Sequence, residues 1–134
     1  QSEEKEKFSR EAMTYLDHLY RVAFHLVKEK GEAQDIVQET YARALGAYEQ
    51  AVAIAEGIAS VEPNNTSLKA DLASLLACKG DPLRKLGRYD EALESYKAAL
   101  KAYQELILAE PEVQEHTLEL ARTEVRIGTV YLYR

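Results

Sequence analysis

The sequence has few of the residues that usually interrupt helices or form disulfide bonds. Its 134 residues include three prolines, six glycines, one cysteine and no tryptophan. The scarcity of proline and glycine leaves room for long uninterrupted helices. Cys78 cannot form a disulfide within the chain, which favours a reducing compartment. Since it has neither a Cys-x-x-Cys partner nor a neighbouring histidine, we expect it to pack in the core.

The sequence contains neither a basic patch nor an apolar run long enough to span a membrane, and we expect no secretory leader. The formal net charge is -6, which repels a nucleic-acid backbone unless basic residues cluster. The densest basic group is interleaved with acidic residues and is typical of a solvated helix surface; it comprises Arg84, Lys85 and Arg88 beside Asp81, Asp90 and Glu91. We expect a soluble, cytoplasmic protein with no nucleic-acid or membrane partner.

What the sequence does contain is helix-forming residues in periodic order. Apolar residues make up 46% and charged residues 30% of the chain, a balance typical of a globular protein. The spacing of three and four predicts an all-α fold, a single domain over 1–134 with about five antiparallel helices. The helices are expected at about 8–30, 32–61, 66–86, 89–109 and 113–134, after an opening at 1–7 that frays.

Breakers set the expected helix ends. Gly31 follows basic residues and is suited to end the first helix. Pro63 lies in a turn, and Gly87 ends the third helix. Pro82 lies inside the third helix, where its ring clashes with the carbonyl four residues back. The helix then either kinks there, the alternative we favour, or restarts with Asp81 as its N-cap.

The expected core is a set of apolar stripes on successive helices. The first stripe comprises Phe8, Ala12, Tyr15, Leu16, Leu19, Ala23, Leu26 and Val27. The second comprises Ala33, Val37, Tyr41, Ala44, Tyr48, Ala51, Ala55 and Ile58. Tyrosines recur on the later stripes as well, and we expect most of them to be buried with their hydroxyl groups at the edge of the core.

The chain resembles itself at a shift of 48 residues. The identities include Tyr41 with Tyr89, Ala44 with Ala92, Leu45 with Leu93, Tyr48 with Tyr96, and Gly80 with Gly128. The segment from Leu86 to Leu100 carries the pattern Gly-x-Tyr-x-x-Ala-x-x-x-Tyr-x-x-Ala-Leu and resembles the tetratricopeptide repeat. This resemblance covers about 47–134, with the shared helix beginning near 41. It implies stacked helix hairpins and a concave face that binds extended peptides.

A second resemblance covers about 8–45. The stretch Asp35-Ile36-Val37-Gln38-Glu39-Thr40, together with Leu16 to Ala23, is similar to region 2 of extracytoplasmic-function sigma factors. The resemblance implies a helix pair over 1–45 that docks on the clamp of RNA polymerase. It places Asp35, Gln38 and Glu39 toward the polymerase. The match ends near 45, without the promoter-melting and DNA-reading segments that follow in the family.

The two resemblances meet inside one helix, with no linker between them. Natural fusions usually join whole domains through exposed linkers. We therefore favour a designed or chimeric helical scaffold with no natural biochemical activity. The alternatives are a tetratricopeptide-type protein-interaction module and a polymerase-docking sigma fragment without DNA-binding parts.

No set of residues predicts catalysis, and we expect neither an enzyme nor a cofactor. His18 and His25 share a helix face, but no third ligand joins them with zinc-site spacing, and His116 is distant in sequence. We therefore predict no metal site and no obligatory partner. Because no helix follows the last one, Tyr131 and Tyr133 form a candidate partner surface, with weak self-association as the expected outcome.

Overall fold

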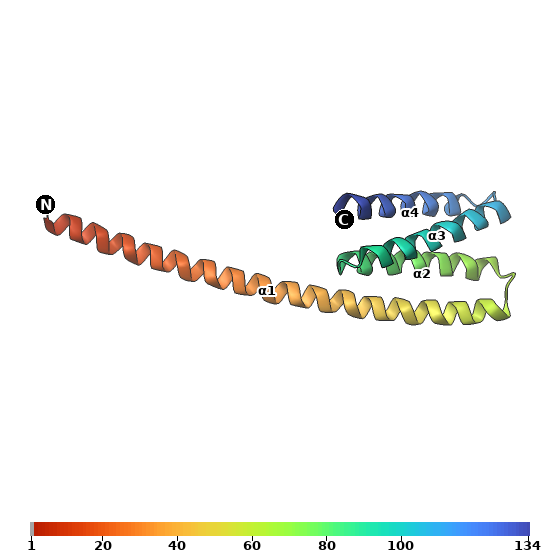
Figure 1. The fold of residues 1–134 in the computed structure, drawn as a ribbon, viewed down its shortest axis with the longest axis horizontal. Coiled ribbons are helices and arrows are strands. Elements are labelled where there is room, and N and C mark those ends of the chain that lie inside the picture. The colour runs from red at the N-terminus through yellow and green to blue at the C-terminus, as the bar shows by residue number, and fades with distance from the viewer. Residues whose placement is uncertain (1) are drawn as a thin grey trace. The chain divides into compact units, whose positions relative to one another are not determined.

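The computed structural model describes residues 2–134, and Gln1 lies outside the described residues. Four α-helices follow one another, and residues 2–134 contain no strand. Figure 1 shows the order of α1, α2, α3 and α4 along the chain. Their bounds are Ser2–Val61, Thr66–Lys85, Tyr89–Ala109 and Gln114–Tyr133. The all-α prediction is confirmed, whereas the prediction of five helices is wrong.

The difference in helix number arises at Gly31, where two helices were expected and one continues. Gly31 does not have a positive φ, and a Cβ there would meet nothing within 4 Å. A glycine inside a helix costs only about 1 kcal/mol relative to alanine, and the flanking Lys30 and Glu32 are good helix formers. The first helix also begins earlier than the expected start at about residue 8, because residues 2–7 are helical as well.

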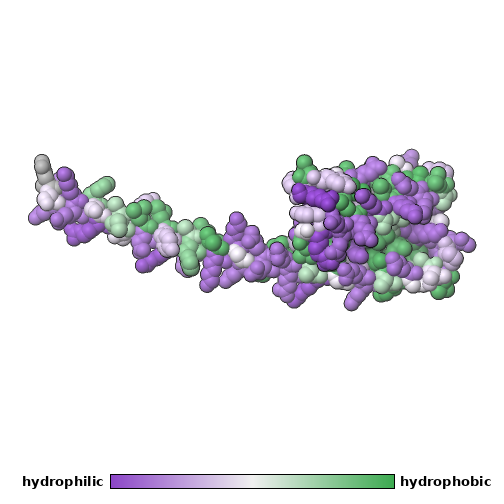
Figure 2. Space-filling model, in the orientation of Figure 1, coloured by the Kyte–Doolittle hydropathy of each residue, from purple (hydrophilic) through white to green (hydrophobic). Residues whose placement is uncertain are grey.

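The chain divides into two compact units, Gln1–Val37 and Gln38–Arg134. In the first unit the predicted apolar stripe is exposed rather than buried. Phe8 is 74% exposed, Leu26 61% and Val27 71%. The surface of this part of α1 in Figure 2 therefore shows hydrophobic patches beside hydrophilic ones.

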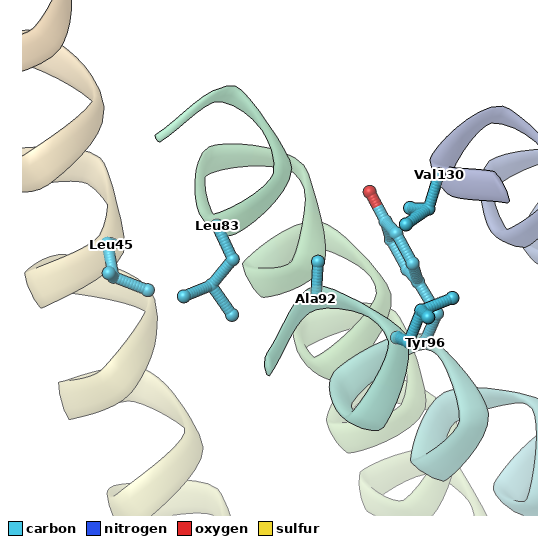
Figure 3. Packing of buried hydrophobic residues seen from close by; sticks show 6 residues of the cluster. Leu45, Leu83, Ala92, Tyr96 and Val130 are labelled. Carbon is cyan, nitrogen blue, oxygen red and sulfur yellow. The ribbon is translucent and has the colours of Figure 1, made fainter. Parts of the chain in front are cut away.

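The core of the second unit joins all four helices. Leu45 of α1 lies in one cluster with Leu83 of α2, Ala92 and Tyr96 of α3, and Val130 of α4. Figure 3 shows the Tyr96 ring reaching toward Val130, and the Leu83 side chain between α1 and the α2–α3 pair. The neighbouring cluster comprises Ala73, Ala77, Ala99, Tyr103 and Leu106. Alanine on α2 allows the aromatic side chains of α3 to pack closely.

The tyrosine prediction is confirmed for Tyr96 and Tyr103 of α3 and only partly for Tyr89 and the tyrosines of α1. Tyr96 is fully buried and Tyr103 is 2% exposed, whereas Tyr41 and Tyr48 are half-buried. Burial of aromatic side chains is thus greatest on α3, the helix that packs against both α2 and α4. Cys78, which was expected in the core, is half-buried on α2.

The ends of the later helices follow the sequence signals. The Asn65 side chain caps α2 by accepting a hydrogen bond from the Leu68 N–H at 3.0 Å. Gly87 adopts φ 78°, so the chain reverses directly after α2. α2 continues through Pro82 without a break, so the restart at Asp81 is wrong, and the kink stays a prediction.

Candidate interaction surfaces

The acidic residues of the sigma-like segment are exposed on α1. Asp35 lies in the first unit, and Gln38 and Glu39 are the first residues of the second. The Glu39 carboxylate accepts a hydrogen bond from the Arg43 guanidinium at 2.7 Å, an ion pair one helical turn apart. Exposed pairs of this kind contribute little to stability. These carboxylates are therefore accessible to a partner at small cost to the fold.

A second candidate surface is a groove in the second unit, where α2 and α4 flank α3. Its volume is about 310 Å³. α2 contributes Ser67, Ala70, Asp71 and Ser74, α3 contributes Tyr103, and α4 contributes Glu115, His116 and Glu119. Three carboxylates line the groove without a lysine or arginine among the lining residues. This charge favours a cationic group over an anionic one.

Tyr103 lies among the lining residues with its ring almost wholly buried. Burial raises the pKa of the Tyr103 hydroxyl, and the nearby Glu119 carboxylate raises it further. A hydrogen bond with Ser74 opposes this rise in pKa. Tyr103 therefore stays neutral at physiological pH and offers a hydroxyl group rather than a charge.

The three histidines differ in their surroundings. His18 and His25 are exposed on α1, as expected for surface residues, but His116 is buried. Its Nε2 lies 3.2 Å from Glu110 Oε1, which joins α4 to the turn before it. The sequence did not predict this contact, because the two residues lie six positions apart with Pro111 between them. In the described part of the chain, no group of three or more His, Cys, Asp or Glu residues could hold a metal ion.

Several large apolar side chains of α4 are exposed among charged and polar ones. Tyr131 is 54%, Leu132 76% and Tyr133 67% exposed. Leu118 and Val125 on the same helix are also exposed. Tyr131 and Tyr133 were predicted as a partner surface. Their exposure makes them available for such a role, while the inner residue Val130 is fully buried in the core.

The basic group at the end of α2 is compensated by acidic neighbours. Arg88 donates two hydrogen bonds to the Glu91 carboxylate, at 3.0 and 2.6 Å. This hydrogen bonding lowers the pKa of Glu91 and raises the pKa of Arg88. The Arg88 charge is thus paired locally, as the sequence indicated.

Comparison with known proteins gives one family match. Residues 12–53 match the family described as Sigma-70 region 2. No curated protein and no solved structure matches the chain. The family match extends past residue 45, where the sequence reasoning ended it, and reaches Ala53. It therefore includes Leu45 and Val52, which are buried in the second unit. Of residues 2–134, no helix is long and apolar enough to cross a membrane.

Proposed function

We propose that the chain is a non-catalytic interaction protein that docks on the RNA polymerase core through its segment similar to sigma-70 region 2. The match of residues 12–53 to this family carries the proposal. Asp35, Gln38 and Glu39 lie inside the matched segment and are exposed. The resemblance assigns them the polymerase-facing role. The protein is expected to act in the cytoplasm, where RNA polymerase is found.

The charge of this segment supports protein docking rather than DNA binding. Residues 32–53 contain one basic side chain, Arg43, and four acidic side chains, Glu32, Asp35, Glu39 and Glu49. Glu56 lies just beyond this range. Such a surface repels phosphate and suits a basic patch on a protein partner. The chain would thus occupy a sigma-type docking position without contacting DNA.

The test measures binding of the full chain to purified bacterial RNA polymerase core by biolayer interferometry. Reversing the charge in the double variant Asp35→Lys, Glu39→Lys should weaken binding by at least ten-fold, about 1.4 kcal/mol. The matched control is Glu94→Lys with Glu105→Lys, two exposed positions on α3 outside the matched segment. Equal binding by the double variant and the control would contradict the proposal.

A second candidate is a tetratricopeptide-type module, and the groove between α2 and α4 favours it. The acidic lining predicts a peptide with lysine or arginine side chains, unlike a ligand that presents a carboxylate. A fluorescent poly-lysine peptide should bind more tightly than a poly-glutamate control. The double variant Asp71→Asn, Glu115→Gln should reduce this difference in affinity. Similar binding of both peptides would exclude this specificity.

A designed or chimeric scaffold without natural activity is the third proposal. The family match moves the position expected for the junction between its fragments. Since the family match reaches Ala53, a junction between fragments would lie at or beyond that residue rather than near 45. The sigma-like part and the core of the second unit then overlap at Leu45 and Val52. Polymerase binding that depends on Asp35 and Glu39 would contradict a scaffold without activity.

The exposed tyrosines at the end of α4 support a further proposal, that the chain associates weakly with itself through this helix. Tyr131 and Tyr133 are its contact residues. Replacing both with serine should lower any concentration-dependent increase in mass at high protein concentration. An unchanged mass profile would assign the self-association to another surface.

A further inference from the structure

We propose that two copies of the chain pair through the first unit, with the apolar stripes of their α1 helices packed antiparallel. The stripe is the set named above, Phe8 to Val27 at spacings of three and four. This proposal concerns a different face of α1 from the polymerase-docking residues, so the two can succeed or fail separately.

The first observation is that the stripe is exposed although it has the pattern of a buried helix face. Tyr15 is 64%, Leu16 59% and Leu19 45% exposed. A single helix in water gains little from its own hydrogen bonds, and most helices in proteins depend on packing of an apolar face. Contiguous exposed apolar surface of this kind marks an interaction site. Figure 2 shows hydrophobic surface along this part of α1.

The second observation is the area that such a pairing would bury. The stripe contains six large side chains: Phe8, Tyr15, Leu16, Leu19, Leu26 and Val27. Each large apolar side chain removes roughly 60–120 Å² of surface from water when it is buried. Twelve such side chains in two copies give roughly 700–1,400 Å², which reaches the lower range of specific interfaces, about 1,200 Å². The upper part of this range meets the area of a small specific interface, with one partner helix of the same sequence.

The third observation concerns direction. Lys30 continues the stripe four residues after Leu26, whereas Glu4 lies four residues before Phe8. Antiparallel pairing in the register centred on position 17 places Lys30 of one copy level with Glu4 of the other. Parallel pairing instead places each charge beside its own kind. Opposite charges favour the antiparallel arrangement.

The same register matches the apolar side chains by position. Phe8 of one copy lies level with Leu26 of the other, and Tyr15 lies level with Leu19. The polar face of the helix stays outside the pair. Asp17 and Arg21 form an exposed ion pair at 3.1 Å on this polar face. Asp35 follows the same helical spacing, so pairing leaves it accessible.

The experiment is sedimentation equilibrium of the full chain across the micromolar range. The expected result is a concentration-dependent species of twice the 15.1 kDa mass of one chain. Leu19→Glu with Leu26→Glu should give a monomer over the same range, because it places charges inside the apolar interface. The matched control, Thr14→Glu with His25→Glu, adds the same charges off the stripe and should still form the dimer. Glutamate is a good helix former, so none of these changes breaks the helix by itself.

Charge reversal tests whether the two α1 helices pair antiparallel or parallel. Lys30→Glu should weaken the dimer by roughly two- to five-fold, as for an exposed pair. Combining it with Glu4→Lys should restore wild-type affinity in an antiparallel pair. Absence of rescue would overturn the antiparallel arrangement.

A wild-type monomer throughout the concentration range, as for a helix that folds back on itself, would overturn the pairing altogether. So would a dimer that survives Leu19→Glu with Leu26→Glu and is lost with Tyr131→Ser and Tyr133→Ser. Loss of polymerase binding in the Asp35 and Glu39 variant, with the dimer retained, would leave this pairing intact.

Discussion

The ring of Tyr96 on α3 lies directly against the backbone of Gly80 on α2. A Cβ at position 80 would lie 2.6 Å from both Cδ1 and Cζ of that ring. The Tyr96 hydroxyl donates a hydrogen bond to the carboxylate of Asp81, the next residue along α2. Tyr96 is fully buried, so its ring cannot move away into solvent. Gly80 thus sets how closely α2 and α3 approach.

Gly80→Ala should therefore destabilise the protein. Overpacking of a filled core costs typically about 1–3 kcal/mol, more than the helix propensity gained. The matched control is Gly128→Ala, the equivalent position in the 48-residue self-comparison. Nothing lies within 4 Å of a Cβ there, so this change should raise the free energy of unfolding by up to about 1 kcal/mol. Urea denaturation of both variants measures the difference, and similar midpoints would contradict the packing argument.

Alkaline pH should weaken the fold through Tyr96. Burial, and then the hydrogen bond to Asp81, raise the pKa of the Tyr96 hydroxyl well above its usual value. The unfolded chain therefore loses this proton at lower pH than the folded chain does. The stabilisation is complete below about pH 10, the ordinary tyrosine pKa, and declines as the pH rises further.

Thermal melts between neutral pH and pH 11 should show this decline, and Tyr96→Phe should reduce its slope. Tyr131→Phe is the control, since that ring is exposed. Equal slopes in the two variants would exclude Tyr96 as the source.

Asp81 should contribute more to the free energy of unfolding than an acidic residue in an exposed ion pair does. It accepts from Tyr96 and lies 3.4 Å from Arg126 Nε of α4, so it joins three helices. Asp81→Ala should cost about 1–3 kcal/mol, because it leaves the buried hydroxyl without its acceptor. Asp90→Ala removes the exposed pair with Arg134 and should cost less than about 1 kcal/mol. Chemical denaturation would refute this role of Asp81 if Asp90→Ala lowered the free energy of unfolding more than Asp81→Ala does.

Gly87 should tolerate no side chain without strain, although it is exposed. Its φ of 78° costs L-residues roughly 1–2 kcal/mol. Gly87→Ala should lower the free energy of unfolding by about that amount. Gly57→Ala is the control, because Gly57 lies inside α1 with open space around its Cβ. A calorimetric comparison in which Gly57→Ala is the more destabilising change would argue against the backbone explanation.

The sequence predicted the second unit better than the first, and the reason is physical. The turn at Pro63 and the helix end at Gly87 are local signals, and the helices expected at 66–86, 89–109 and 113–134 agree with α2, α3 and α4 to within a residue or so. Gly31 is an ambiguous signal, because a glycine can either end a helix or lie inside one. Deciding between these outcomes requires knowing whether the two stripes beside it pack against each other, which periodicity does not reveal.

A candidate surface could be predicted from the sequence only where the position of a residue along the chain indicates that its side chain is exposed. The exposure of Tyr131 and Tyr133 was expected from their position on the last of the predicted helices. The groove residues Asp71 and Glu119 were missed, because they belong to helices that are not adjacent in sequence. Likewise, nothing in the sequence near Gly80 predicts that Tyr96 covers it. The self-similarity between Gly80 and Gly128 indicated close packing at both positions, yet the structure has it only at Gly80.

The connections between the helices are short, spanning 62–65, 86–88 and 110–113. Within the second unit, α2 packs mainly with α3 and α3 with α4, so most contacts join neighbours along the chain. Little chain entropy is lost before such contacts form, and helical proteins of this kind fold in microseconds to milliseconds. We therefore expect the second unit to refold faster than mixed or all-β domains of its length, as temperature-jump fluorescence of its tyrosines would measure.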